Sequence, residues 1–538
     1  MDIVDKIKQR ILRFLGLEKL AGNPNQERMA LVNDPDDVKL QNAQEARVWY
    51  MGNSNDLLAY YTGEAIAGFA HNQIYNRNRA NYFWGISPEE ANIKRVHSGL
   101  PRAIVDTLVS VVGVPKITGT PKCGEGEIDV SKLLNECGFL EEYTERQMPL
   151  TLAEGWGAWK VSVGADARVS EWPTVQFYEA SDVDFAVRNG KAIGVVFKNY
   201  YRQGNKDYLL LETRRINERG NSAIEYELYQ LGKNDELKPV PMETVEGLEG
   251  LKDVEFPGFK KVLAVPCHFF SDPDNPGYGR SVFAGKIDLF DDIDQSLSQR
   301  SQTSRVSTPV EYYSPDVLGR DGNGNPKMPK VYNRQYVQKS GIPDGDGRID
   351  TSIQTTQPNL NLSQYNEEQQ ALVSMALTGI ISPSTLGLGI SKRDNAEAQR
   401  EKEKVTIMTR EKIVVRETEI LRDLAEVATA MKVYMDTGAV PLDEPEISVR
   451  FSDFANPSFE SQSRTLLPMW QAGAISNEMY VEKLYGEDLK GDDRERELEA
   501  LASNKAEKAR VALPVERSEE YSTLMPNAPQ IGQKTPLR

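Results

Sequence analysis

Residues able to perform chemistry are few in this chain, and their spacing does not complete a known site. Asp321-x-Asn323-x-Asn325 begins like a calcium-binding loop. However, Pro326 replaces the glycine that such a loop requires, and Tyr332 stands where its bidentate glutamate belongs. We therefore expect no calcium site in this segment.

The sequence motifs of nucleotide-binding sites and of nucleophilic catalytic sites are also incomplete. Gly387-Leu-Gly389 lacks the third glycine of a dinucleotide fingerprint, because Lys392 occupies that position, and the chain has no G-x-x-x-x-G-K-[ST] phosphate loop. A zinc site or a Ser-His-Asp arrangement would have to draw on three histidines, which are His71, His97 and His268. The chain has 80 acidic residues, so a pair of carboxylates for metal-assisted DNA cleavage stays open as an alternative. We expect no cofactor, no resident metal and no catalytic residues, which favours a protein that is not an enzyme.

Two groups of polar residues are instead candidates for a role beside nucleic acid. Lys392 and Arg393 are the only basic residues of the Gly/Pro/Ser-rich stretch 379–394, so they are candidates for weak phosphate contacts. An equally simple interpretation is that they pair with acidic neighbours. In the same stretch, Pro383 fixes the chain entry, and Gly387 and Gly389 permit backbone changes. The second group lies on one side of a helical pattern and comprises Asp288, Asp291, Asp292 and Gln295.

Charge and composition limit the class of protein. The formal net charge of −16 argues against wrapping nucleic acid on a broad basic face, although it permits DNA to slide past without sticking. The three cysteines, Cys123, Cys137 and Cys267, form no disulfide framework. No apolar run reaches the length of a membrane span, and the amphipathic stretch 2–17 is expected to dock on its own fold.

A long helix organises the C-terminal half of the chain. Asn395 to Met435 contains no Gly or Pro and predicts a helix of about 60 Å, with Asp394 as N-cap and Thr437-Gly438 as the stop. Its second half carries an apolar stripe that must pack against something, formed by Ile413, Ile420, Leu424, Val427, Met431 and Tyr434.

A second helical pattern, with Ser281 as its cap candidate, follows Gly277-Tyr-Gly-Arg-Ser281. Its apolar stripe consists of Phe283, Ile287, Phe290, Ile293 and Leu297. A further helix is expected at Ser363–Thr378, after a turn-rich segment with strand-like runs at 310–313 and 331–337.

The rest of the chain predicts a mixed α+β protein. Helical patterns occur at 44–61, 101–112, 130–154, 459–471, 477–485 and 492–512. Strand patterns occur at 157–163, 175–178, 185–188, 193–201, 208–214, 224–231 and 446–454, with Asn189-Gly190 as a hairpin turn.

The order of these elements resembles the portal protein of tailed bacteriophages, the head-to-tail connector of the siphophage type. The resemblance is best at Leu377-Thr-Gly-Ile-Ile-Ser-Pro-Ser-Thr-Leu-Gly387 and at Asn395-Ala-Glu-Ala-Gln-Arg-Glu-Lys402, and the Gly-x-Gly-x-Ser element at 277–281 also fits it. Neither of the first two motifs is catalytic. The match therefore depends on pattern and on order along the chain.

The resemblance implies an α+β subunit with named parts. These are an N-terminal helix and arm at 1–40, a wing at 41–276, a first stem helix at 277–306, a clip at 307–360, a second stem helix at 361–378, a channel loop at 379–394, a long wing helix at 395–437, a wing strand at 438–456, crown helices at 457–512 and a flexible tail at 513–538.

The resemblance also implies a place and partners. About twelve copies would form a ring at one capsid vertex of the virion, after synthesis in the host cytoplasm, and double-stranded DNA would pass through it during packaging and ejection. The expected partners are other copies of the chain, major capsid and scaffolding proteins, terminase and a head-completion adaptor, with no membrane.

Two expectations about surfaces follow. The apolar stripes of the long helix and of the 281–297 helix offer more apolar surface than one subunit need cover, which favours shared packing between subunits. If the second stripe faces neighbouring subunits, then Asp288, Asp291 and Asp292 form an acidic channel wall. A tail or baseplate protein and a metal-dependent DNA-processing enzyme remain the alternatives.

Overall fold

The computed structural model is a mixed α+β protein, as the sequence predicts, and it divides into two compact units at residues 1–452 and 453–538. The structure describes residues 37–64, 81–87, 93–123, 126–162, 172–232, 237–307, 310–313, 322–324, 335–338, 354–356, 362–388, 396–438, 446–452, 466–468, 470, 475–485 and 494–502. The predicted helix at 2–17 and the tail at 513–538 lie outside these ranges.

Helix α11 (Ala396–Thr437) confirms the predicted long helix to within two residues at its end. It ends because Gly438, at φ 70°, adopts the left-handed conformation and donates its N–H to the Tyr434 carbonyl at 2.9 Å. The predicted N-cap, Asp394, lies outside the described residues.

One face of α11 is buried within its own unit. Ile413, Leu424 and Met431 are 0% exposed, and Ile420 and Val427 are also buried. The helix contacts α5 (Leu100–Val112), α6 (Val130–Glu136), β4 (Trp156–Ser162) and β12 (Ala264–His268). Most of this stripe is therefore buried within the subunit. It does not supply the extra apolar surface for packing between subunits that was expected from the sequence.

Six antiparallel strands form the largest sheet, in the order β10-β9-β8-β7-β6, with β11 also paired to β9. The hairpin between β6 and β7 turns through Asn189 (φ 52°) and Gly190 (φ 73°), the left-handed pair predicted from Asn-Gly. The strands are β6 (Val183–Arg188), β7 (Lys191–Gln203), β8 (Lys206–Ile216), β9 (Ser222–Leu231), β10 (Leu237–Pro239) and β11 (Val254–Phe256), with short 3₁₀ turns η6 (Ala180–Asp182) and η7 (Met242–Thr244) nearby in the chain.

A three-stranded antiparallel sheet, β12-β4-β5, carries part of the main core. In β4 Trp159 is 0% exposed and packs edge-on against Phe177 of β5 (Thr174–Glu179), with ring centroids 5.7 Å apart. Cys267 of β12 is also fully buried, as expected for a free thiol used in packing. This sheet lies against α11, so the long helix is fixed on a rigid layer.

Glycines divide two of the predicted helices. The pattern at 44–61 is split into α2 (Val38–Met51) and α3 (Ser54–Thr62) because Gly52 adopts φ 67°. The pattern at 130–154 is split after α6 because Gly138 adopts φ 74°. It continues as α7 (Phe139–Glu142), one π-helical turn η5 (Tyr143–Gln147) and α8 (Met148–Glu154).

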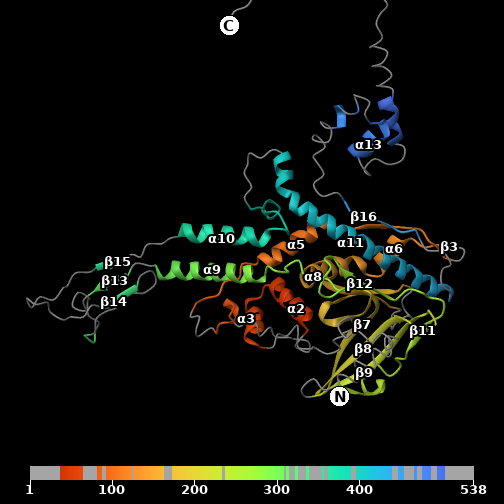
Figure 1. Ribbon diagram of the computed structural model, residues 1–538, viewed down its shortest axis with the longest axis horizontal. Helices are drawn as coiled ribbons and strands as arrows, with labels where there is room; N and C mark the ends of the chain where they lie inside the picture. The colour runs from red at the N-terminus through yellow and green to blue at the C-terminus, as the bar shows by residue number, and fades with distance from the viewer. Residues whose placement is uncertain are drawn as a thin grey trace, which may run out of the picture. The chain divides into compact units, whose positions relative to one another are not determined.

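Helices α9 (Ile287–Val306) and α10 (Leu362–Leu377) lie side by side (Figure 1). They run antiparallel, since Arg300 contacts Gln369 while the later Thr303 contacts the earlier Tyr365. Between them in the chain lies a small sheet in which β13 (Val310–Tyr313) pairs parallel with β14 (Gln335–Gln338) and antiparallel with β15 (Gln354–Thr356). The predicted order of helix, small strand module and helix is confirmed.

Two short strand pairs complete the first unit. β16 (Ser448–Arg450) pairs antiparallel with β1 (Lys116–Thr118), so the predicted strand at 446–454 joins neither of the larger sheets. β2 (Lys122–Cys123) pairs with β3 (Gly126–Glu127).

The second unit contains α13 (Asn477–Tyr485), as predicted. Ser476 caps it by accepting the N–H of Met479 at 3.1 Å. Trp470 packs on Tyr480 with ring centroids 5.3 Å apart, in a small cluster with Leu466, Ile475 and Leu501. Residues 466–468 and 494–502 are helical, as expected in those parts of the patterns at 459–471 and 492–512.

Helix α11 itself carries a buried carboxyl group. Glu417 is 0% exposed, and its Oε2 accepts a hydrogen bond from Nε2 of the equally buried Gln147 at 3.2 Å. Gln147 ends the π-helical turn η5, a local irregularity that places its side chain opposite α11. Burial raises the pKa of Glu417 to about 8, so the carboxyl group is held mainly neutral at pH 7.

Replacing Glu417 by Gln should flatten the dependence of stability on pH. A carboxyl group whose pKa rises from 4.5 to about 8 on folding holds its proton more tightly in the native state. The wild-type free energy of unfolding therefore falls as pH rises between those values, by about 1.4 kcal/mol per pH unit from this group alone. Urea titrations from pH 5 to 8 measure this.

The matched control for that experiment is Glu419→Gln, because Glu419 lies on the same helix with 55% of its side chain exposed. It should leave the slope unchanged. Equal slopes for the wild type and Glu417→Gln would contradict a buried neutral Glu417.

Candidate functional site

The segment before α9 is a series of turns rather than the start of the helix. Ser281 Oγ accepts the N–H of Phe283 at 2.9 Å, but α9 begins only at Ile287, which corrects the predicted cap. Gly279 has no room for a side chain, because a Cβ there would lie 2.2 Å from the Gly155 carbonyl oxygen. The Gly-x-Gly-x-Ser element thus fixes the approach to α9 by close packing of backbone.

The predicted acidic face of α9 divides into buried and exposed residues. Asp291 is 6% exposed and accepts the backbone N–H groups of Phe83 (2.8 Å) and Trp84 (3.4 Å) in the 3₁₀ turn η4 (Phe83–Gly85). Burial raises the pKa of Asp291 to about 6, against the effect of these two hydrogen bonds. Asp291 therefore cannot line a channel wall from this position, which corrects the prediction.

The other members of that face are accessible. Asp288 and Asp292 are exposed and Gln295 is half-buried. Asp288 accepts a hydrogen bond from the Tyr82 hydroxyl, which draws the η4 segment onto the start of α9. The acidic wall was expected only if the apolar stripe faced other subunits, yet Phe283, Phe290 and their partners are buried in this one. Burial of the stripe within one subunit thus removes the reason for placing Asp288 and Asp292 on a channel wall.

Asp294 is the acidic residue that the sequence analysis missed. It is 0% exposed, and its carboxylate contacts Trp84 Nε1 (3.0 Å), His97 Nδ1 (2.7 Å) and the Ser98 N–H (2.8 Å). These contacts attach both the η4 turn and the strand-like segment before α5 to the same turn of α9. The sequence places four acids within the seven residues 288–294 and does not show which of them are buried. The position of the η4 turn, which contacts Asp291 and Asp294, decides this.

Three acids of the helix pair remain close together at the surface. Glu368 of α10 accepts a hydrogen bond from Ser296 of α9 at 3.4 Å. Burial, and then the negative charges of Asp288 and Glu368, raise the pKa of Asp292. We call Asp288, Asp292 and Glu368 the acidic group; it concentrates negative potential on one side of the pair.

The turn between α10 and α11 is attached to the long helix. It contains η9 (Pro383–Leu386), and Gly387 ends it at φ 76°, which agrees with the conformational freedom predicted for this glycine. Thr406 of α11 is fully buried; its Oγ1 accepts the Ser382 N–H at 2.8 Å and lies 2.8 Å from Thr385 Oγ1. Thr406 therefore helps to hold the turn that carries Pro383 on α11, and the turn also contacts α5.

Gly389, Lys392 and Arg393 lie outside the described residues, as do Asp321 and Asn325 of the incomplete calcium motif.

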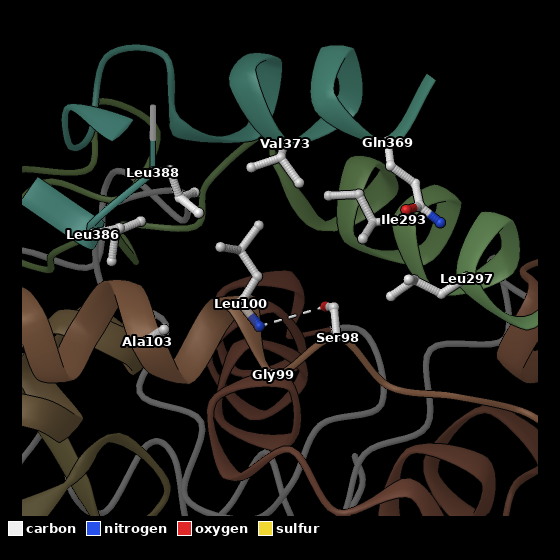
Figure 2. Close-up of a pocket in the computed structure, with 10 residues that line it drawn as sticks. All are labelled: Ser98, Gly99, Leu100, Ala103, Ile293, Leu297, Gln369, Val373, Leu386 and Leu388. Carbon is white, nitrogen blue, oxygen red and sulfur yellow. Dashed lines mark hydrogen bonds between the residues drawn. The ribbon is translucent and has the colours of Figure 1, made fainter. Parts of the chain in front are cut away.

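An apolar cleft of about 290 Å³ lies where α5, α9, α10 and the η9 turn meet. Figure 2 shows side chains from all four segments directed into one space. Its lining consists of Ser98, Gly99, Leu100, Ala103, Ile293, Leu297, Gln369, Val373, Leu386 and Leu388. Sequence reasoning did not find the cleft, because its residues come from four separate segments.

His268 and its neighbours do not form a catalytic arrangement. His268 Nε2 lies 3.0 Å from Arg416 Nη2, and burial followed by the Arg416 charge lowers the pKa of this histidine to about 4. Across the described parts of the chain, no group of three or more His, Cys, Asp or Glu side chains could hold a metal ion. Within the same parts, no helix has the length and apolar character needed to cross a membrane.

No protein-family model matches the chain, and a search of curated proteins finds no significant match.

Replacing Asp294 by Ala should destabilise the protein by about 3 kcal/mol, because it leaves several buried donors around α9 without an acceptor. Asp292→Ala is the matched control, since Asp292 lies two residues away and is exposed. It should change the free energy of unfolding by less than about 0.5 kcal/mol. Chemical denaturation measures both variants. Similar losses for the two would show that Asp294 does not organise this region.

Proposed function

We propose that this chain is the portal subunit of a tailed bacteriophage. About twelve copies form a ring at one vertex of the capsid, through which double-stranded DNA enters during packaging and leaves during ejection. The ring docks terminase and later a head-completion adaptor, and it contacts the major capsid and scaffolding proteins.

The observation that carries the proposal is the order α9, small sheet, α10, anchored turn, α11. Two antiparallel helices bracket a compact strand module, and the η9 turn and a helix of 42 residues follow in the chain. This is the order of stem, clip, stem, channel loop and long helix in the family that the sequence resembles. A tail or baseplate protein has no need of such a bracketed module.

Charge supports the same proposal. A net charge of −16 suits a conduit past which DNA must slide, because a strongly basic lining would hold the phosphates. The acids buried around α9 and α11 have structural partners, and we assign none of them a catalytic role. A nuclease would instead be recognised by metal-dependent DNA cleavage.

The first consequence is a closed oligomer. Native mass spectrometry of the purified chain should show a dominant species of about twelve or thirteen copies, because ring subunits associate through repeated head-to-tail contacts. A stable monomer at micromolar concentration, with scaffolding protein present, would contradict the portal proposal.

The second consequence concerns the loop before α11. Replacing Lys392 and Arg393 together by Ala should leave rings and capsids normal but reduce packaged or retained DNA several-fold, because weak phosphate contacts in the channel are lost. The matched control is Lys412→Ala with Arg422→Ala, two exposed basic residues of α11. DNA content per capsid is the measurement. Normal DNA content in the loop variant, or loss of its rings, would contradict a phosphate contact.

A further inference from the structure

The apolar cleft is an open feature of the folded subunit. Leu100, Ile293, Leu297 and Val373 project into it, and Leu388 at its edge is 43% exposed (Figure 2). An accessible cavity with this lining is a typical site for an apolar side chain of a partner.

A candidate for that side chain lies on the other side of α10. Met375 is 57% exposed, among the most exposed large apolar residues of the described chain. It follows Val373 by two residues, which places it about 200° around the helix from the cleft. Methionine is unbranched and flexible, so it adapts to an irregular cavity. One helix pair thus presents an apolar cavity on one side and an apolar projection on the other.

The charges on the two sides are complementary. Glu368 of the acidic group precedes Met375 by seven residues, or about two turns, so it lies on the same side of α10 as Met375. Lys286 Nζ donates to the Met375 carbonyl at 2.8 Å. On the cleft side, Arg300 follows Leu297 by three residues and contacts the cleft residue Gln369 at 3.0 Å.

We propose that the Met375 side of one copy docks on the cleft of the next copy. Met375 enters the cleft, and the acidic group faces Arg300 of the neighbour. A head-to-tail ring requires two different complementary surfaces on each subunit, and these two surfaces meet that requirement. Opposite charges at the edge set the register and disfavour other pairings. The inference rests on the proposed ring and names the contact that builds it.

This docking gives the acidic group a different role from the one expected in sequence. Asp288 and Asp292 then lie between subunits instead of lining the channel. The argument for this assignment is helical spacing: Asp288 and Asp292 are four residues apart on α9, and Glu368 of the same group is seven residues from Met375 on α10.

The direct test is chemical cross-linking of paired cysteines. In a Cys123→Ser background, Ala103→Cys with Met375→Cys and a short bis-maleimide should give a ladder of covalent multimers on a denaturing gel. Ala103→Cys adds one atom to the cleft and keeps its leucines. Each single cysteine variant should remain monomeric on the gel. The matched control pairs Ala103→Cys with Val254→Cys, since Val254 is 41% exposed on the distant strand β11.

The outcomes separate the docking from the function. Rings seen by electron microscopy without a ladder would overturn the docking and leave the portal proposal standing. A wild-type chain that forms no ring would overturn the portal proposal, and the docking with it.

A charge exchange tests the same contact without cysteines. Glu368→Lys should raise the protein concentration needed for half-assembly about tenfold at low salt, and adding Arg300→Glu in the same chain should restore it. Glu368 is exposed, so the single variant should fold. If Glu368→Lys leaves assembly unchanged but alters DNA packaging, the acidic group lines the channel and the docking is wrong.

Discussion

Burial of one face of α11 is the constraint on which the first unit depends. Ile413, Leu424 and Met431 lie along about five turns of helix, and each contributes roughly 1.5–3 kcal/mol by leaving water. The same helix holds the η9 turn through Thr406, and it holds the end of α5 through Arg410, whose Nε donates to the Val111 carbonyl at 2.9 Å. The candidate channel segment is therefore attached at its start to the long buried helix α11.

The acidic residues around α9 illustrate how one sequence pattern serves two purposes. Asp291 and Asp294 accept hydrogen bonds from backbone and ring donors, and so attach the η4 turn to the helix. Asp292 remains exposed and joins Glu368 near the surface. The buried pair provides structural support, while the exposed acids are available to a partner. The proposed ring would need both, because its subunits would have to be rigid and also recognise one another.

The sequence predicts elements with strong local signals well. The long helix was predicted from a stretch without Gly or Pro, and the β6–β7 hairpin from Asn189-Gly190, because in both cases local geometry decides the outcome. Local signals were also sufficient for the order of α9, the small sheet and α10. The breaks at Gly52 and Gly138 were missed because a glycine can either be tolerated inside a helix or end it in the left-handed conformation, as both do here. Asp294 and the cleft were missed because their roles depend on segments far apart in sequence.

A two-dimensional class average of the purified, full-length protein by electron microscopy tests the central claim most directly. The account predicts particles with rotational symmetry and an axial hole wide enough for a DNA duplex. Compact particles without a hole, or open filaments, would contradict it.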